Sequence, residues 1–192
     1  MYTKIKNKLI SIYQIICFKK YCIKTSCNIK KILKISNPKY IYLGKNIRIK
    51  PGARLECYDF FASNILCPKL IIEDNVIIEY NFSCLVADKV IIGKDTIVAS
   101  NVLITSENHG INPESNLQYH EQPLVTGKVT IGKGCWIGEK VIILPNVSIG
   151  DKSIISAGSI VTKDVPDYCI VAGVPAKIIK KYNFNKHIWE KV

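Results

Sequence analysis

One polar stretch, ENHGINPESNLQYHEQPL (107–124), concentrates side chains that could perform acid–base chemistry, including two of the chain's three histidines. His109 is the leading candidate, because an imidazole titrates near neutral pH and can take a proton from a hydroxyl nucleophile. Glu107 could orient that ring or contact a substrate, and His120 could help to bind an acceptor. A catalytic zinc ion bound by histidines alone needs three of them, with two only a few residues apart. His109 and His120 are eleven residues apart, so they do not predict a metal site.

The stretch is followed by aliphatic residues that return every six positions. They are Ile131, Ile137, Ile143, Ile149, Ile155 and Val161. A helix favours apolar spacings of three and four, and a half-buried strand favours alternation. A period of six therefore predicts a chain that itself turns every six residues. Three such hexads make one triangular coil, and the aliphatic side chains of successive coils stack into an interior column.

The same repeat precedes the polar stretch. In-phase residues are Ile72, Ile78 and Cys84, then, after a slip of two residues, Val86, Ile92, Val98 and Ile104. A first excursion is expected at YDFFASNILCPK (58–69), and a second, longer one over residues 105–128. Long loops on rigid scaffolds tend to carry function. We therefore expect the active site in the loop over 105–128.

Four motifs of the C-terminal half resemble a known family. They are WIG (136–138), ILPNV (143–147), AGSIVTKDVP (157–166) and AGVPAK (172–177). Together they resemble hexapeptide-repeat acyltransferases, in particular the branch of galactoside, maltose and polysaccharide O-acetyltransferases, over about residues 40–181. The resemblance implies an all-β, left-handed parallel β-helix. It also implies a homotrimer with active sites at subunit interfaces, and acetyl transfer from acetyl-CoA.

The resemblance also implies roles for the polar residues. The loop histidine of the family, here His109, is the general base: it deprotonates the acceptor hydroxyl, which attacks the thioester carbonyl and releases coenzyme A. Asn81 and Asp88 fall near family positions that bind sugar hydroxyls. With Glu107 and His120 they form the expected acceptor-binding set.

Cofactor contacts are implied on the later coils. Small side chains at Ala157 and Gly158 would leave room for the pantetheine arm, and Lys177 and Lys180 match positions where the family places cations near the phosphates. Lysines recognise phosphate as point charges, without the bidentate geometry of arginine. The full expected set is Trp136, Glu139, Ala157, Gly158, Thr162, Lys163, Lys177 and Lys180.

Composition describes a basic chain that can form a core. Its 192 residues carry a net charge of +12, and 48% of them are hydrophobic. A basic surface suits polyphosphate cofactors or an anionic lipid surface. Nucleic-acid binding is not expected, because zinc-finger spacings and aromatic–basic RNA signatures are absent. The eight cysteines form no C-x-x-C pair, so we interpret them as reduced thiols of a cytoplasmic protein.

The chain divides into three expected segments. Residues 1–28 should form an amphipathic helix with Ile5, Leu9, Ile12 and Ile16 on one face. Its apolar stretch is too short to span a bilayer, which leaves capping of the domain or weak attachment to a membrane surface. Residues 29–170 should form the β-helix, and residues 171–192 a tail or helix.

The leading function is O-acetylation of a sugar hydroxyl in surface polysaccharide, lipopolysaccharide or capsule biosynthesis, in the cytoplasm or at the inner face of the membrane. Another acceptor is the main alternative: an amino sugar, serine or a streptogramin-type antibiotic. A non-catalytic β-helical scaffold is the remaining one, and His109 together with SAGSIVTKD (156–164) argues against it. The residues themselves do not select the acceptor.

Overall fold

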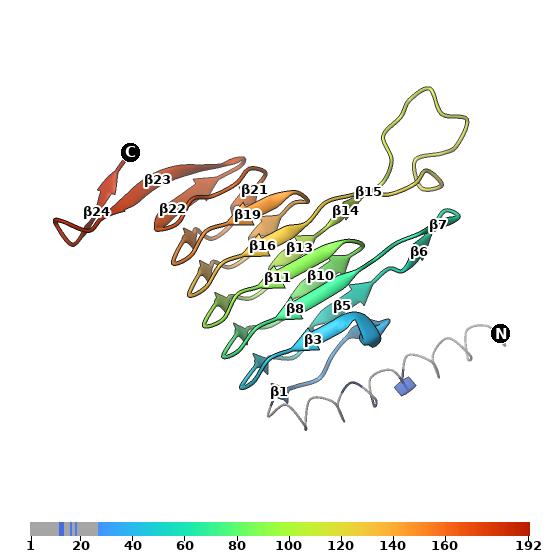
Figure 1. The fold of residues 1–192 in the computed structure, drawn as a ribbon, viewed down its shortest axis with the longest axis horizontal. Coiled ribbons are helices and arrows are strands. Elements are labelled where there is room, and N and C mark those ends of the chain that lie inside the picture. The colour runs from blue at the N-terminus through green and yellow to red at the C-terminus, as the bar shows by residue number, and fades with distance from the viewer. Residues whose placement is uncertain (1–11, 14–15, 17, 19–26) are drawn as a thin grey trace.

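The computed structural model describes residues 12, 13, 16, 18 and 27–192, and from residue 28 the chain winds as a stack of triangular coils (Figure 1). Each coil places one short parallel strand on each of three faces. Face A contains β1 (Asn28–Ile29), β4 (Arg48–Ile49), β9 (Ile77–Ile78), β12 (Ile97–Val98), β17 (Trp136–Ile137), β20 (Ile154–Ile155) and β22 (Cys169–Gly173). Face B contains β2 (Lys34–Ser36), β5 (Arg54–Cys57), β10 (Ser83–Val86), β13 (Leu103–Thr105), β18 (Ile142–Ile143) and β21 (Ile160–Val161). Face C contains β3 (Ile41–Leu43), β8 (Lys69–Ile72), β11 (Lys89–Ile92), β16 (Val129–Ile131) and β19 (Val147–Ile149), and the 3-10 turn η1 (Pro38–Tyr40) precedes β3.

The aliphatic column predicted from the six-residue period is confirmed. On face B, for example, Cys84 pairs with Ile104, which pairs with Ile143 in the next coil. All three side chains are fully buried. The two-residue slip also has a structural cause. Strand β10 continues to Val86, which pairs with Cys57, so this strand turns two side chains inward, where β18 and β21 on the same face turn one.

The corners of the coils are polar and tightly packed. Asn75 and Asn81 adopt a left-handed backbone conformation, which asparagine tolerates better than most residues. Their side chains form ladders along the corners, from Asn75 Nδ2 to Asp95 Oδ1 at 2.8 Å, for instance. At Gly132 a Cβ would lie 2.7 Å from the backbone nitrogen of Asp151. Close approach between coils therefore explains this corner glycine.

The C-terminal segment forms strands instead of the expected tail or helix. Strand β23 (Ala176–Asn183) pairs antiparallel with β22, and β24 (Ile188–Lys191) pairs antiparallel with β23, so the two strands extend face A beyond the last coil (Figure 1). Side chains along β23 alternate between half-buried and exposed over most of the length of the strand. This period of two suits an added strand and does not suit an amphipathic helix.

The N-terminal segment is described at four positions, Ile12, Tyr13, Ile16 and Phe18, all of which are helical. Phe18 is buried in the core, whereas Ile12 and Ile16 of the predicted apolar face are exposed. The helix predicted for residues 1–28 is wrong at its end, because Asn28 begins β1. Residues 1–11, 14–15, 17 and 19–26 of that prediction lie outside the described residues. Among the residues that the structure describes, no helix is long and apolar enough to cross a membrane.

Two excursions interrupt the prism at one corner, where face B turns into face C. We call this corner the B–C edge. The second coil extrudes a hairpin of β6 (Phe60–Phe61) and β7 (Asn64–Ile65), and the fourth extrudes a long loop between β14 (Glu107–Asn108) and β15 (Val125–Thr126). Both project on the same side of the molecule (Figure 1).

Candidate active site

His109 lies at the root of the long loop, directly after β14. Its side chain is exposed, and its ring meets that of Phe61 from the hairpin at a centroid distance of 5.5 Å and an interplanar angle of 60°. An exposed imidazole can reach a substrate hydroxyl. Accessibility of this kind is necessary for a general base.

Glu107 lies two residues before His109 and is half-buried. Burial raises the pKa of its carboxyl, and the nearby His109 and the Thr105 hydroxyl offset only part of that effect. The Thr105 hydroxyl also donates to the Glu107 backbone oxygen at 2.9 Å, which fixes the turn at the loop root. An ionised Glu107 would stabilise the positive charge that His109 gains when it accepts a proton.

The loop is organised around Gln122, which sequence reasoning missed. This side chain is only 4% exposed. Its Oε1 accepts from the Asn112 backbone N–H at 3.0 Å, and its Nε2 donates to the Asn112 and Leu117 carbonyls at 3.0 and 3.1 Å. A Cβ at Gly110 would lie 2.6 Å from the Gln122 Cβ. The glycine after His109 therefore lets the loop close on this amide.

The outer part of the loop carries the other predicted polar groups. His120 is exposed there, eleven positions beyond His109. The neighbouring Glu121 accepts a bond from the Gln118 backbone N–H at 3.1 Å through its Oε2. Glu121 therefore caps a turn of the loop. The carboxyl whose pKa the charge of His109 lowers, against the larger effect of burial, is that of Glu107.

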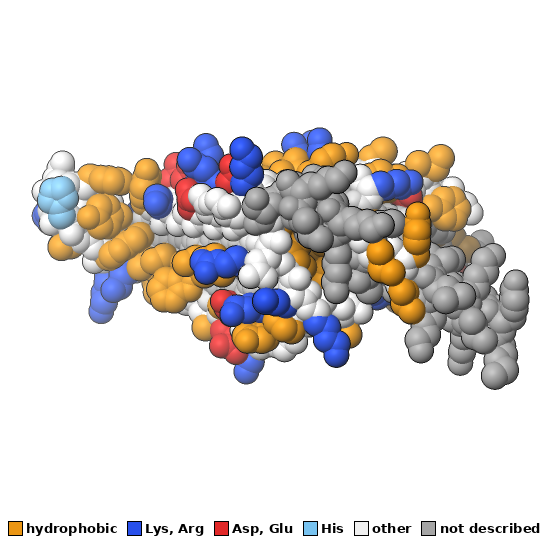
Figure 2. All heavy atoms as spheres, turned by 90° about the horizontal axis from the view of Figure 1, so that it is seen from below, with side chains coloured by type: hydrophobic (Ala, Val, Ile, Leu, Met, Phe, Trp, Pro, Cys, Tyr) orange, Lys and Arg blue, Asp and Glu red, His pale blue; other side chains and the backbone are white. Residues whose placement is uncertain are grey.

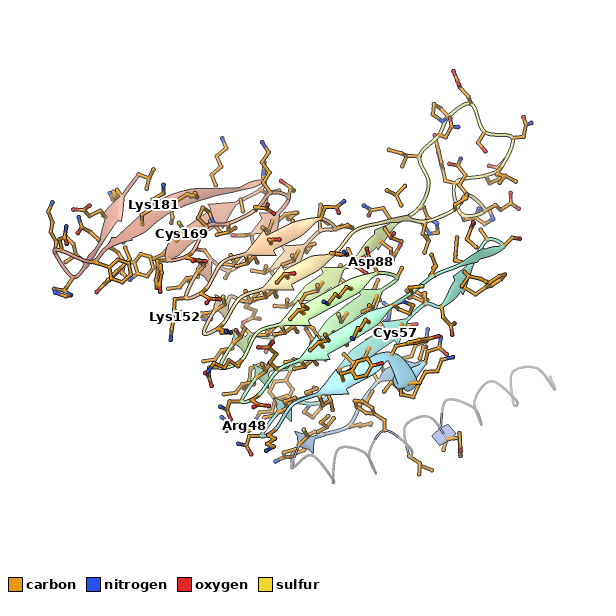
Figure 3. All side chains as sticks on the ribbon, in the orientation of Figure 1. Arg48, Cys57, Asp88, Lys152, Cys169 and Lys181 are labelled. Atoms are coloured by element: carbon orange, nitrogen blue, oxygen red, sulfur yellow. The ribbon has the colours of Figure 1, made fainter. Side chains whose placement is uncertain are left out.

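The structure separates the two predicted acceptor contacts. Asp88 lies at the B–C edge, in the coil between the hairpin and the long loop; Figure 3 shows it near the base of the loop. Its backbone N–H donates to the buried Ser106 hydroxyl at 3.1 Å. Asn81 lies at the opposite end of β10, where its Nδ2 donates to Asn101 Oδ1 at 3.2 Å. Within one protomer, face B therefore separates Asn81 from His109.

The corner that holds Asn81, between faces A and B, we call the A–B edge. Glu139, Ala157 and Gly158 of the expected cofactor set follow it in later coils, and all three are exposed. Gly158 has φ 72°, and a Cβ built there meets no atom within 4 Å. Open space beside small residues fits an extended arm such as pantetheine.

The remaining expected cofactor residues lie elsewhere. Thr162 and Lys163 follow β21 at the B–C edge, and Lys177 and Lys180 lie on β23. Trp136 is 56% exposed on face A. On the side of the molecule that Figure 2 shows, basic and hydrophobic side chains are interspersed. Within the described residues no three His, Cys, Asp or Glu side chains gather in a way that could hold a metal ion.

Sequence comparisons place the chain among known transferases. Residues 128–163 match the family model "Bacterial transferase hexapeptide (six repeats)". The putative lipopolysaccharide biosynthesis O-acetyl transferase WbbJ of Escherichia coli K12 is 36% identical over 163 residues, which cover 82% of this chain and 80% of that protein. The galactoside O-acetyltransferase of the same organism is 40% identical over 58% of this chain and 55% of its own length.

Structural comparisons agree with this placement. A maltose O-acetyltransferase from Clostridium difficile 630 is 31% identical and superposes with a TM-score of 0.63, over 74% of this chain and 71% of that one. A variant of AntD, an N-acyltransferase from Bacillus cereus, gives a TM-score of 0.68 over 88% and 90% of the two chains at 22% identity, which shows the shared fold. The expected class, a left-handed parallel β-helix, is confirmed. With its repeat, its stacked coils and its similarity over four-fifths of its length, the chain belongs to the hexapeptide-repeat acyltransferases.

Proposed function

We propose that the chain transfers an acetyl group from acetyl-CoA to a sugar hydroxyl, with His109 as general base. The exposed His109 at the root of the long loop, backed by the Glu107 carboxyl, carries the proposal. The Escherichia coli and Clostridium difficile relatives named as O-acetyltransferases support the reaction class.

His109 does two things in the proposed reaction. Its free ring nitrogen accepts the proton of the acceptor hydroxyl while that oxygen forms a bond to the thioester carbonyl carbon. When the carbon–sulfur bond breaks, the imidazolium returns the proton to the departing sulfur, so the products are the acetyl ester and free thiol. Acetyl-CoA supplies the activated acetyl group. Glu107 stabilises the transient imidazolium electrostatically.

The cofactor would lie along the A–B edge. Ala157 and Gly158 offer the open surface that the pantetheine arm needs, since a Cβ at Gly158 meets nothing nearby. Lys177 and Lys180 on β23 would meet the phosphates. Trp136 and Glu139 are further contacts we propose on the same subunit. Thr162 and Lys163 lie at the B–C edge, so we propose that they contact the cofactor held by the neighbouring subunit.

We propose a homotrimer because the site is divided in this way. His109 belongs to the B–C edge and the pantetheine surface to the A–B edge, and one protomer holds these edges on opposite sides of face B. A closed threefold arrangement would set the B–C edge of one subunit against the A–B edge of the next. Sedimentation velocity should give a trimer; an active monomer would contradict this part of the proposal.

The acceptor we propose is a sugar of a surface polysaccharide or of its lipopolysaccharide or capsule precursor, acetylated in the cytoplasm or at the inner face of the membrane. The lipopolysaccharide relative, which the chain matches over most of its length, favours this acceptor over an amino sugar, serine or a streptogramin-type antibiotic.

An acceptor screen tests the proposal. Thiol release from acetyl-CoA would be followed with oligosaccharides, nucleotide sugars, amino sugars and serine, and the products identified by mass spectrometry. We expect acetyl esters on saccharides. Release that depends on serine or amino sugars alone would select the alternatives, and no transfer to any acceptor would favour a scaffold.

A further inference from the structure

The β6–β7 hairpin reaches the active site, although it leaves the prism two coils before the long loop. We propose that Phe61 of this hairpin is a positioning residue for His109, and that the face of the hairpin that bears Phe61 forms one wall of the acceptor site; this inference rests on the proposed function. Phe61 is half-buried, and its ring lies against the otherwise exposed imidazole.

The hairpin root is anchored to the first coil. Asn37 Nδ2 donates to the Cys57 carbonyl at 2.8 Å and to Asp59 Oδ1 at 3.0 Å. Tyr40 donates to Asp59 Oδ2 at 3.1 Å, and Lys39 pairs with the same oxygen at 3.2 Å. Burial alone would raise the pKa of Asp59, but the bonds from Lys39 and Tyr40 outweigh it and lower that pKa. The root is thus fixed by several polar contacts.

The hairpin tip has a defined register. Ala62 and Ser63 have φ values of 45° and 64°, which is the two-residue turn that matches the twist of paired strands. Phe61 pairs with Asn64, and Phe60 pairs with Ile65. Because successive side chains of a strand point to opposite faces, Phe61 and Phe60 face opposite sides of the hairpin.

Hairpin and loop run side by side at two levels. Near the root, burial raises the pKa of Tyr58 to about 12, with contributions from the negative charges of Glu56 and of Glu107 in the loop. Farther out, the rings of Phe61 and His109 meet. Between them the third coil turns from β10 to β11 through Ala87 and Asp88 alone, so no bulky segment separates the two excursions.

This geometry gives Phe61 a specific task. A ring packed at a tilt against an imidazole is a favourable aromatic arrangement, and it restricts rotation of the exposed His109 side chain. A general base acts only from within hydrogen-bond reach of the hydroxyl, so restricting its orientation raises the fraction of productive complexes. The contact should therefore affect turnover and leave acetyl-CoA binding on the later coils unchanged.

The test compares Phe61→Ala with Phe60→Ala, the adjacent residue on the opposite face. We expect Phe61→Ala to lower kcat about 10-fold, in keeping with the strength of an aromatic pair. The KM for acetyl-CoA should stay constant, and Phe60→Ala should stay within about twofold of the parent. Phe61→Tyr retains the ring and should restore most of the turnover. Equal kcat in Phe61→Ala and Phe60→Ala, or a loss confined to the KM for acetyl-CoA, would overturn the proposal.

A measurement on the resting protein separates this inference from the reaction itself. The imidazole C–H resonances of the three histidines can be assigned with His→Ala variants. Loss of the Phe61 ring current should shift the His109 signal in Phe61→Ala and not in Phe60→Ala. An unshifted signal would overturn the contact. Should Phe61→Ala fail to fold, Phe61→Leu serves the same comparison. Failure of the parent to acetylate any sugar would instead overturn the proposed function.

Discussion

The aliphatic column and the B–C edge use the same backbone scaffold in opposite ways. In the column, Ile104 is equivalent to Ile143 one coil away, and the side chains are interchangeable in type and fully buried. At the edge, Gln122, Glu107 and His109 have no equivalents in neighbouring coils, because the excursion that contains them occurs once. Repetition therefore builds the buried column, and we propose that the general base lies where the repetition is interrupted.

The largest effect should come from the edge. His109→Ala should lower kcat about 10²–10⁴-fold, the usual range for a general base. The unfolding temperature should stay near that of the parent, because no stacked aliphatic is touched, and acetyl-CoA should still bind. Steady-state kinetics and thermal unfolding on the same preparation check both points.

His120→Ala is the control, because this residue lies in the exposed outer part of the same loop. It should cost far less turnover. Near-parental activity in His109→Ala together with an inactive His120→Ala would reverse the assignment within the loop.

The opposite pattern is expected in the column. Ile104 is fully buried, and replacing it by alanine should lower the free energy of unfolding by about 2–5 kcal/mol through the lost burial and the cavity left behind. Ile111 in the long loop is 78% exposed, so Ile111→Ala should change stability by less than about 0.5 kcal/mol. Chemical denaturation measures the free energy of unfolding of both variants. Equal losses of stability in Ile104→Ala and Ile111→Ala would contradict the comparison.

Strand β23, which belongs neither to the column nor to the B–C edge, should affect cofactor binding instead of turnover or stability. Lys177→Ala and Lys180→Ala on β23 should each raise the KM for acetyl-CoA about 2- to 5-fold with little change in kcat, because a phosphate contact acts equally in ground and transition states. An unchanged KM would return both lysines to a solvated role. Lys186→Ala, beyond the end of β23, is a suitable control because Lys186 pairs with Glu190.

The smallest effect concerns Glu107 and pH. Burial raises the pKa of this carboxyl in the folded state, so its contribution to stability is greatest below the ordinary glutamate pKa and falls as the pH rises through the higher folded value. At neutral pH the buried carboxylate therefore costs free energy. Glu107→Gln should raise the unfolding free energy by less than about 1 kcal/mol at pH 7 and leave it unchanged near pH 3. A loss of stability at pH 7 that disappears in acid would contradict the sign.

The column could be predicted from the sequence because it depends on one local rule, an inward side chain every six residues. The edge residues required more. Asn81 and Asp88 are only seven positions apart in the sequence. They lie at opposite ends of one strand because β10 spans four residues, Ser83–Val86, between them. Gln122 is buried by closure of the loop on itself, and Phe61 meets His109 across an intervening coil. Neither contact leaves a periodic signal. The lysine-rich sequence of β23 likewise does not predict a strand, because this segment becomes one by pairing with the free edge of β22.

The central claim is that the reaction needs the B–C edge of one subunit and the A–B edge of another. Its most direct test is complementation between two inactive variants. His109→Ala removes the base, and Ala157→Trp blocks the pantetheine surface at the other edge. Coexpressed subunits that assemble at random would form about a quarter of their sites from two intact edges, so activity should recover to about that level. Mixed trimers no more active than either variant alone would contradict the claim.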